Sequence, residues 1–331
     1  MHKYTISTAW ITTNYSCNNN CIWCYASNEI HSNRKMNYEK AKEVVDLLCE
    51  LGIKKIILIG GEPTLYTQLF ELIEYIKSKN ENINVGITTN GIKLSDLNYV
   101  KQLKTIGLNG CNISLKGLSE KEYQMCTGNI TGYFDCLKAI QNSIHLGLNL
   151  TVSYVFSTME VAKVNSLYQF CMDNHIKKLM IQFVKPTIGK DNSSMMRLKD
   201  MALLTEYIYK NWEDDIDYKI EASFPLCLID RTILNELQKK HKLLTGCHIR
   251  TGSGINIDPE GKVIPCNHFI DLPYVEKSLE SISDIEIIRN TQEYKLVREK
   301  ASTYVYPNCK QCTLWKICGG GCFTRWFYET P

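Results

Sequence analysis

The sequence predicts an α/β fold: a partial (β/α)6 barrel of the TIM type, followed by a small cysteine-rich C-terminal domain. Two observations support this prediction. Short β-rich runs alternate with amphipathic stretches up to about residue 190, and cysteines and glycines accumulate after residue 241. Repeated β-α units favour a parallel sheet with helices outside it, and right-handed crossovers curl such a sheet into a full or partial barrel.

The individual elements follow from hydrophobic periodicity. Strands are expected at residues 4–13, 55–60, 84–89, 111–115, 150–156 and 179–184. Helices are expected at residues 38–51, 67–79, 95–106, 133–146 and 160–174. In the first helix one face carries only apolar residues, and Gly52 suits its C-terminal cap.

Three domains are expected from these patterns. Residues 1–190 form the barrel, residues 191–240 form a charged helical linker, and residues 241–331 form the C-terminal domain. The last segment has six cysteines but only short apolar runs, so it has too little core to fold without metal ligation.

Composition excludes several functional classes. The chain has 331 residues, 44% of them hydrophobic, which is enough for a large core, and its net charge of +3 indicates no strong attraction to nucleic acid or a membrane. No apolar run reaches the roughly 18 residues of a membrane span, and no signal peptide is visible. We therefore expect a cytoplasmic protein that binds neither membranes nor nucleic acid.

The 15 cysteines are expected to bind metal clusters rather than to form disulfides, because the chain shows no export signal. Five of them fall in helix or strand patterns away from the clustered motifs and are expected to be buried apolar residues. These are Cys49, Cys111, Cys126, Cys136 and Cys171.

The most informative motif is C-x3-C-x2-C, formed by Cys17, Cys21 and Cys24 after the first expected strand. Three thiolates on one loop suit three irons of a 4Fe-4S cluster and leave the fourth iron open to a small chelating cosubstrate. A structural zinc loop is the alternative, but zinc sites usually pair two distant C-x2-C knuckles.

Three further motifs follow the next three expected strands: GGEP, TTNG and SLKG. All of them fall at the carboxyl end of the sheet, where barrel enzymes build their sites. Since Ser114 and Lys116 are two residues apart on a strand, both side chains are expected on the same face. The candidate residues from these motifs are Gly60, Gly61, Glu62, Pro63, Thr89, Asn90, Ser114 and Lys116.

On these four motifs the chain resembles the radical S-adenosylmethionine (SAM) superfamily. The resemblance implies that the open iron binds the amino and carboxylate groups of SAM. Reduction by one electron then cleaves SAM to methionine and a 5′-deoxyadenosyl radical, which abstracts a hydrogen atom from the substrate. GGEP would bind the amino group of SAM, with the Glu62 carboxylate facing the ammonium. Thr89 and Asn90 would support that segment and the nucleoside.

The resemblance also suggests roles for less certain positions. Many relatives with an extra cluster domain have Asp where Lys116 stands, so Lys116 either binds a carboxylate as a point charge or is a solvated lysine. Trp23, inside the cysteine loop, would shield the cluster and pack near adenine, whereas Tyr25 is expected to do no more than pack. Ser153, on the fifth expected strand, is a weaker candidate for the SAM site.

A second cysteine set in the C-terminal segment resembles the SPASM or twitch extension of radical SAM enzymes, which binds auxiliary 4Fe-4S clusters. Its members are Cys247, Cys266, Cys309, Cys312, Cys318 and Cys322. The residues around Asp258 and Gly261 read as a hairpin turn that would bring Cys247 and Cys266 onto neighbouring strands. A zinc ribbon is the alternative for the last four cysteines.

Six cysteines are too few for two complete clusters, which need eight ligands. A complete SPASM domain has one further cysteine beyond its last CxxxC pair, and the residues after Cys322 contain none. The segment holds either one twitch-like cluster or two incompletely ligated clusters, and we favour two. Cys227 has three interpretations: a seventh ligand, a buried apolar residue, or a catalytic thiol that donates a hydrogen atom to a substrate radical.

The resemblance implies a maturase that acts on a ribosomally made peptide, with a crosslink, a thioether or an epimerised residue as product. The alternative enzyme oxidises a small molecule or a protein side chain, as twitch dehydrogenases and sulfatase maturases do. An iron–sulfur electron carrier is disfavoured, because a carrier has no use for a SAM pocket. A flavodoxin or ferredoxin is the expected electron donor. Because the barrel begins within the first residues, a separate leader-binding protein or a short substrate is also expected.

Overall fold

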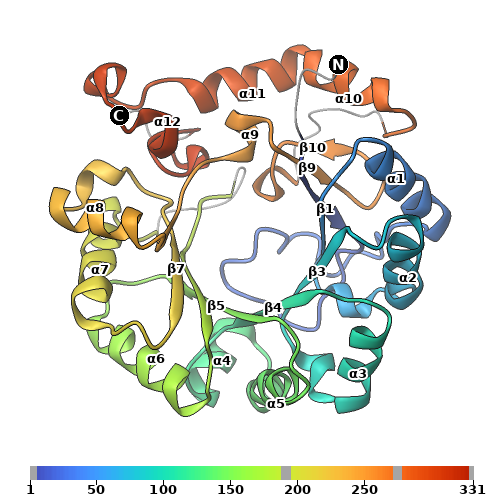
Figure 1. The fold of residues 1–331 in the computed structure, drawn as a ribbon, viewed down its shortest axis with the longest axis horizontal. Helices are drawn as coiled ribbons and strands as arrows, with labels where there is room; N and C mark the ends of the chain where they lie inside the picture. Colours follow the sequence, from blue (N-terminus) through green and yellow to red (C-terminus); the bar gives the residue numbers. More distant parts are fainter. Residues whose placement is uncertain (1–5, 188–194, 271–277, 328–331) are drawn as a thin grey trace. The chain divides into compact units, whose positions relative to one another are not determined.

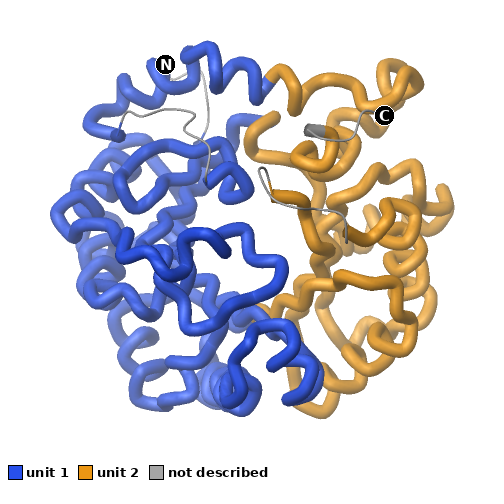
Figure 2. Tube along the Cα trace, turned by 180° about the vertical axis from the view of Figure 1, so that it is seen from behind, with its two compact units in different colours: residues 1–150, 251–298 blue, residues 151–250, 299–331 orange. Residues whose placement is uncertain are grey.

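The computed structural model describes residues 6–187, 195–270 and 278–327. The chain divides into two compact units. The first comprises residues 1–150 and 251–298, and the second comprises residues 151–250 and 299–331 (Figure 2).

The first unit is built on a mainly parallel sheet with the strand order β10-β9-β1-β2-β3-β4. Its strands are β1 (Thr8–Thr12), β2 (Lys55–Ile59), β3 (Asn84–Thr89), β4 (Gly110–Leu115), β9 (Gly254–Ile257) and β10 (Val263–Ile264). β1 pairs in parallel with both β2 and β9, and only β9 and β10 are antiparallel. Its helices, shown around the sheet in Figure 1, are α1 (Tyr38–Glu50), α2 (Leu69–Lys79), α3 (Leu97–Thr105), α4 (Glu120–Thr127), α5 (Gly132–His145) and α10 (Ile282–Asn290), with α11 (Gln292–Ser302) at the boundary of the unit.

The second unit is built on the parallel strands β5-β6-β7-β8. These are β5 (Leu150–Phe156), β6 (Lys178–Phe183), β7 (Asp217–Glu221) and β8 (Leu243–Leu244). Its helices are α6 (Val161–Asp173), α7 (Leu198–Asn211), α8 (Arg231–Lys239), α9 (His248–Thr251) and α12 (Trp315–Cys318), and short 3-10 turns lie at Leu226–Leu228, Pro307–Gln311 and Phe323–Phe327.

Side-chain alternation fixes which face of each strand is buried. On β4, Ile113 and Leu115 are buried, whereas Asn112, Ser114 and Lys116 at the intervening positions are half-buried. The apolar face of β4 lies toward α5, and further fully buried residues, such as Val44, Val45, Leu72 and Ile73, stand on α1 and α2. The second face therefore carries the polar residues that are available for a site.

The α/β class is confirmed, and so are most of the expected elements. The five expected helices agree with the structure within two residues at each end, and the strands after the first agree within one residue. Residues 4 and 5 of the first expected strand lie outside the described part of the chain. Of the five cysteines expected to be buried, Cys111, Cys136 and Cys171 are, but Cys49 and Cys126 are half-buried.

Two expectations were wrong in detail. The segment expected to be a helical linker contains β7, whose buried Tyr218 and Ile220 alternate with charged residues and which pairs with β6. The Asp258 hairpin does form, between β9 and β10, but Cys247 lies on no strand. It directly precedes α9, and Gly252 (φ +71°) lies between α9 and β9.

The hairpin turn is held by the carboxylate of Asp258, which accepts hydrogen bonds from the backbone N–H groups of Glu260 (3.0 Å) and Lys262 (2.7 Å). Glu260 in turn receives a bidentate pair from Arg34, with N–O distances of 2.8 and 2.6 Å. Burial raises the pKa of Asp258 from 3.8 to about 7, and the Arg34 guanidinium lowers the pKa of Glu260.

The raised pKa of Asp258 predicts a pH-dependent stability. Between its usual pKa of 3.8 and about 7, the folded state binds the proton more tightly than the unfolded state, so this group lowers stability as pH rises. Asp258→Asn keeps the acceptor oxygen and removes the charge. We expect its melting temperature, relative to that of the parent protein, to rise with pH across this window, by the equivalent of about 1.4 kcal/mol per pH unit at most. A constant difference across the window would show that Asp258 does not titrate there.

Candidate active site

Hydrogen bonds connect the cysteine loop after β1 to the segment that contains α4. The N–H of Asn20 donates to the carbonyl of Thr127 (2.8 Å), and the N–H of Ile22 donates to the carbonyl of Cys126 (3.0 Å). The side-chain amide of Asn19 donates to the hydroxyl of Tyr123 (3.0 Å). The loop conformation is therefore set by the chain itself, with its three cysteines half-buried.

The thiols in this loop suit metal ligation. The backbone N–H groups of Asn19 and Ala26 point at the sulfurs of Cys17 and Cys24, each at an N–S distance of 3.4 Å. Burial raises the pKa of Cys17 to about 12 and also raises that of Cys21. A buried thiolate needs a bound cation or donors to the sulfur to compensate for its desolvation, and an iron cluster supplies the former.

The GGEP segment runs directly along the residues that precede Cys17. The N–H groups of Gly61 and Glu62 donate to the carbonyls of Asn14 and Ser16, both at 2.8 Å. A Cβ atom at Gly61 would lie 2.0 Å from the Tyr15 carbonyl oxygen. At Gly60 it would lie 2.5 Å from the Asn14 carbonyl oxygen. Both glycines are thus required by packing within the chain, and not only by the approach of a cosubstrate.

The Glu62 side chain, directly after β2, forms hydrogen bonds with residues at the end of β3. It is only 1% exposed, and its carboxylate accepts hydrogen bonds from Thr64 (N–H 3.1 Å, hydroxyl 2.7 Å), the Thr89 hydroxyl (2.6 Å) and the Asn90 N–H (2.7 Å). Burial raises its pKa, and these four donors act against that rise. Three of these donors bind Oε1 and only the Asn90 N–H binds Oε2, so the chain fixes the carboxylate and leaves Oε2 able to accept a further hydrogen bond.

Asn90 links this junction to the cysteine loop. Its side-chain amide donates to the Asn18 side-chain carbonyl (2.6 Å) and lies 3.9 Å from the Cys17 sulfur. Pro63 begins a 3-10 turn directly after Glu62 and is buried. The predicted residues of GGEP, TTNG and the cysteine loop are therefore connected by direct hydrogen bonds within the first unit.

Ser114 and Lys116 lie on the same half-buried face of β4, as their spacing predicted. Lys116 lies close enough to Cys21 for its charge to lower the pKa of that thiol against the effect of burial. Asn112, on the same face, was missed: its side-chain oxygen is buried and has no partner among the described residues. The alternation along β4 was the signal that pointed to it.

The cysteine loop also contains two aromatic residues, Trp23 and Tyr25. The indole N–H of Trp23 is buried without a partner in the described part of the chain, which suits a bound group beside the loop. Tyr25, expected only to pack, donates its hydroxyl to the Gly60 carbonyl (3.2 Å). Ser153 is buried on β5 in the second unit.

The C-terminal cysteines are divided between the units. Cys266 follows β10 in the first unit, and the other five lie in the second. Gly319, Gly320 and Gly321 between Cys318 and Cys322 all have positive φ values of 54°, 78° and 86°. Side chains there would collide with Arg250, Val305 and the Phe224 backbone, respectively. The glycines are required by this turn and its packing, rather than only by a cluster.

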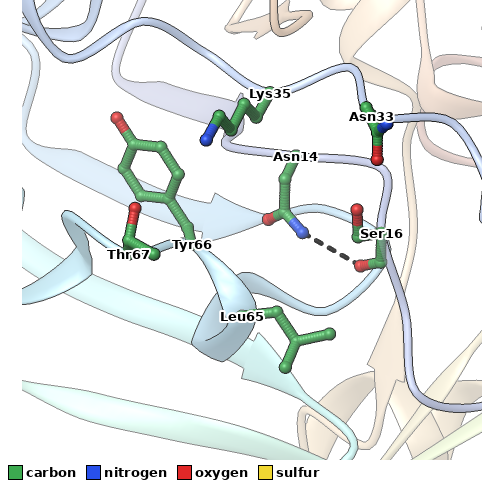
Figure 3. A pocket seen from close by; sticks show the side chains of 7 residues that line it. All are labelled: Asn14, Ser16, Asn33, Lys35, Leu65, Tyr66 and Thr67. Atoms are coloured by element: carbon green, nitrogen blue, oxygen red, sulfur yellow. Dashed lines mark hydrogen bonds between the residues drawn. The ribbon is translucent and has the colours of Figure 1, made fainter.

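Within the described ranges, no three His, Cys, Asp or Glu side chains converge on a point that could hold a single metal ion. A pocket of about 240 Å³ lies beside the GGEP segment and is drawn in Figure 3. Its lining residues are Asn14, Ser16, Asn33, Lys35, Leu65, Tyr66 and Thr67. None of the predicted SAM-site residues lines it, so we do not assign it to that site.

A cysteine loop after β1, a glycine–glutamate segment after β2 and a separate cysteine set define an iron–sulfur enzyme on a parallel α/β sheet. Comparison with known families agrees: residues 11–170 match the radical SAM superfamily, and residues 247–313 match the SPASM iron–sulfur cluster-binding domain. The chain therefore carries a radical SAM domain joined to a SPASM domain. The sheet is that of a radical SAM partial barrel.

Similar proteins span several activities. A Sulfurisphaera tokodaii protein named "Probable GTP 3',8-cyclase" is 25% identical over 89% of this chain and 93% of its own length. A 7,8-dihydro-6-hydroxymethylpterin dimethyltransferase of Methanocaldococcus jannaschii is 27% identical over 86% of this chain and 58% of its own length. Streptococcus suis SuiB, solved bound to precursor peptide SuiA, shares the fold with a TM-score of 0.74, at 19% identity over 98% of this chain and 73% of that chain.

The two domains establish the cofactors. The protein uses SAM, a 4Fe-4S cluster that binds SAM, and auxiliary iron–sulfur ligation in the SPASM domain. The buried thiols of the cysteine loop and the unpartnered Trp23 and Asn112 atoms fit such an occupant. No helix among the described residues has the length and apolarity needed to cross a membrane.

Replacing Cys17, Cys21 and Cys24 together with alanine is predicted to abolish reductive SAM cleavage, because the open iron is lost with its ligands. The measurement is 5′-deoxyadenosine formation with dithionite. Cys49→Ala removes a half-buried thiol from α1 and serves as the control that should retain activity. Normal 5′-deoxyadenosine formation by the triple variant would refute the assignment.

Glu62→Gln is predicted to weaken SAM binding by about 1–3 kcal/mol, the range for a hydrogen bond to a charged group. The amide replaces one acceptor oxygen with a donor, which faces the donors of Thr64, Thr89 or Asn90. Thr64→Val is the control, since it removes one of these donors and keeps the charge. Equilibrium binding of SAM checks both variants, and an unchanged dissociation constant for Glu62→Gln would remove Glu62 from the site.

Proposed function

We propose that this radical SAM enzyme abstracts a hydrogen atom from a ribosomally made peptide and yields a crosslink, a thioether or an epimerised residue. The observation that carries the proposal is the SPASM domain over residues 247–313, whose cysteine set resembles that of peptide-modifying radical SAM enzymes. The shared fold with SuiB, solved with a precursor peptide, is compatible with this substrate class. When bound and reduced, the cluster with SAM supplies the 5′-deoxyadenosyl radical.

The chain's own residues have distinct roles in this proposal. Cys17, Cys21 and Cys24 hold three irons. Glu62 keeps the end of β2 in place through Thr64 and Asn90 and contributes a fixed negative charge toward the SAM ammonium. This role follows from its hydrogen bonds, because four internal donors already fix the carboxylate.

The remaining site residues surround the cosubstrate. Lys116 supplies a positive charge beside Cys21, suited to the SAM carboxylate. Trp23 and Asn112 present buried polar atoms to the same region, and Thr89 and Asn90 fix the Glu62 carboxylate. Ser114, on the face of β4 that carries Lys116, is proposed to contact the cosubstrate.

We further propose a flavodoxin or ferredoxin as the electron donor, since cleavage of SAM consumes one electron per turnover. A separate leader-binding protein is the proposed second partner for recognition of the peptide. Both are interactions that sequence resemblance suggests, and pull-down with each purified candidate tests them.

A second candidate is radical chemistry on a small molecule. The GTP cyclase and pterin dimethyltransferase relatives favour a purine nucleotide or a pterin as that substrate. Radical oxidation of a protein side chain, as in sulfatase maturation, is the related alternative. The structures of anSMEcpe with bound AdoMet share the fold at a TM-score of 0.72 and 19% identity over 95% of this chain.

Mass spectrometry separates these candidates. Reconstituted enzyme with SAM and dithionite is incubated with the peptide encoded beside its gene, or with GTP, and the triple cysteine variant is the control. We expect the peptide to lose two mass units if it is crosslinked or oxidised, or to gain one deuterium from heavy water if it is epimerised. Consumption of GTP with an unchanged peptide would contradict the proposal and support the second candidate.

A further inference from the structure

Cys227 lies against the C-terminal cysteines within the second unit. It stands in the 3-10 turn Leu226–Leu228, which follows β7. The backbone N–H of Leu226, the residue before it, donates to the sulfur of Cys318 at 3.3 Å. Cys227 is exposed, so its interpretation as a buried apolar residue was wrong.

The contact between these two segments is extended and fixed. The N–H of Cys322 donates to the Ser223 carbonyl (3.1 Å), and Gly321 lies so close to the Phe224 backbone that a Cβ atom would approach it to 2.6 Å. Residues 223–227 therefore run directly along residues 318–322. The position of Cys227 beside Cys318 follows from backbone packing and not from a mobile side chain.

Three of the C-terminal thiols lie near enough to Cys227 to act on it electrostatically. Burial is the largest cause of the raised pKa of Cys227, and the charges of Cys318, Cys309 and Cys312 add to the rise. This agrees with the backbone contacts that place Cys227 beside Cys318.

We propose that Cys227 is the fourth ligand of an auxiliary 4Fe-4S cluster whose other ligands are Cys309, Cys312 and Cys318. These three follow the C-x2-C-x5-C spacing and supply three of the four thiolates that fully ligate a 4Fe-4S cluster. Cys227, from before the SPASM segment, supplies the fourth in this chain. The inference rests on the SPASM assignment and does not depend on the identity of the substrate.

Complete ligation has a chemical consequence. A cluster with four cysteine ligands has no open iron, so this one is suited to electron transfer rather than to direct substrate binding. Each ligand thiol gives up its proton on binding iron. Cys227 would then carry no S–H bond, which excludes it as a hydrogen-atom donor to a substrate radical.

The test uses the full chain with Cys17, Cys21 and Cys24 replaced by alanine, so that only auxiliary clusters remain. After anaerobic reconstitution with iron and sulfide, adding Cys227→Ala leaves three cysteine ligands and one open iron, so it is expected to shift the g-values of the reduced electron paramagnetic resonance spectrum of that cluster. Cys318→Ala is expected to shift the same signal. Cys49→Ala is the matched control with an unshifted spectrum, and circular dichroism checks folding of each variant.

A second variant covers the case in which alanine destabilises the segment. Cys227→Ser retains an oxygen ligand, and it is expected to keep the cluster but to shift the g-values of its reduced electron paramagnetic resonance spectrum. In Cys322→Ala the signal of the cluster that includes Cys227 should be unchanged. An unshifted spectrum in Cys227→Ala or in Cys227→Ser would overturn the proposal. Neither result depends on peptide modification, so failure of the substrate proposal is distinguishable.

Discussion

The SAM site depends on one junction, where Gly61 and Glu62 lie along the backbone of Asn14 and Ser16. The two N–H bonds of 2.8 Å place the end of β2 beside the start of the cysteine loop. The Glu62 carboxylate then binds Thr89 and Asn90 at the end of β3, and Asn90 reaches Asn18 in the loop. Three consecutive motifs thus share one hydrogen-bonded network, and a shift at any of them would move the cysteines.

This network shows which features of the site the sequence could predict and which it could not. Apolar residues that recur every two or every 3.6 residues predicted the strands and helices of the first unit, because these elements have one strongly apolar face. The cysteine spacing and GGEP indicated the chemistry. The sequence did not reveal, however, that the two glycines of GGEP lie in close contact with Asn14 and Tyr15. Such contacts join positions distant in sequence, which local patterns do not encode.

The same limit applies in the second unit. β7 was missed because three of its five residues are charged, and its pairing with β6 and β8 makes it a strand. From the sequence alone Cys227 has three interpretations, since nothing local indicates its neighbours. The hydrogen bond from Leu226 to Cys318 supports the proposed ligand role, and it spans 92 residues of sequence. Long-range contacts, rather than residue type, decide the roles of isolated cysteines.

The two cysteine regions share two structural features. In each, backbone N–H groups point at sulfurs: Asn19 at Cys17, Ala26 at Cys24 and Leu226 at Cys318. In each, glycines allow the backbone that carries the cysteines to pack against another segment without a side chain between them. Donors fixed in advance stabilise thiolates over thiols, and they lower the cost of burying these ligands before iron binds. The positions of the thiols are therefore set by main-chain packing, and their chemistry follows from that placement.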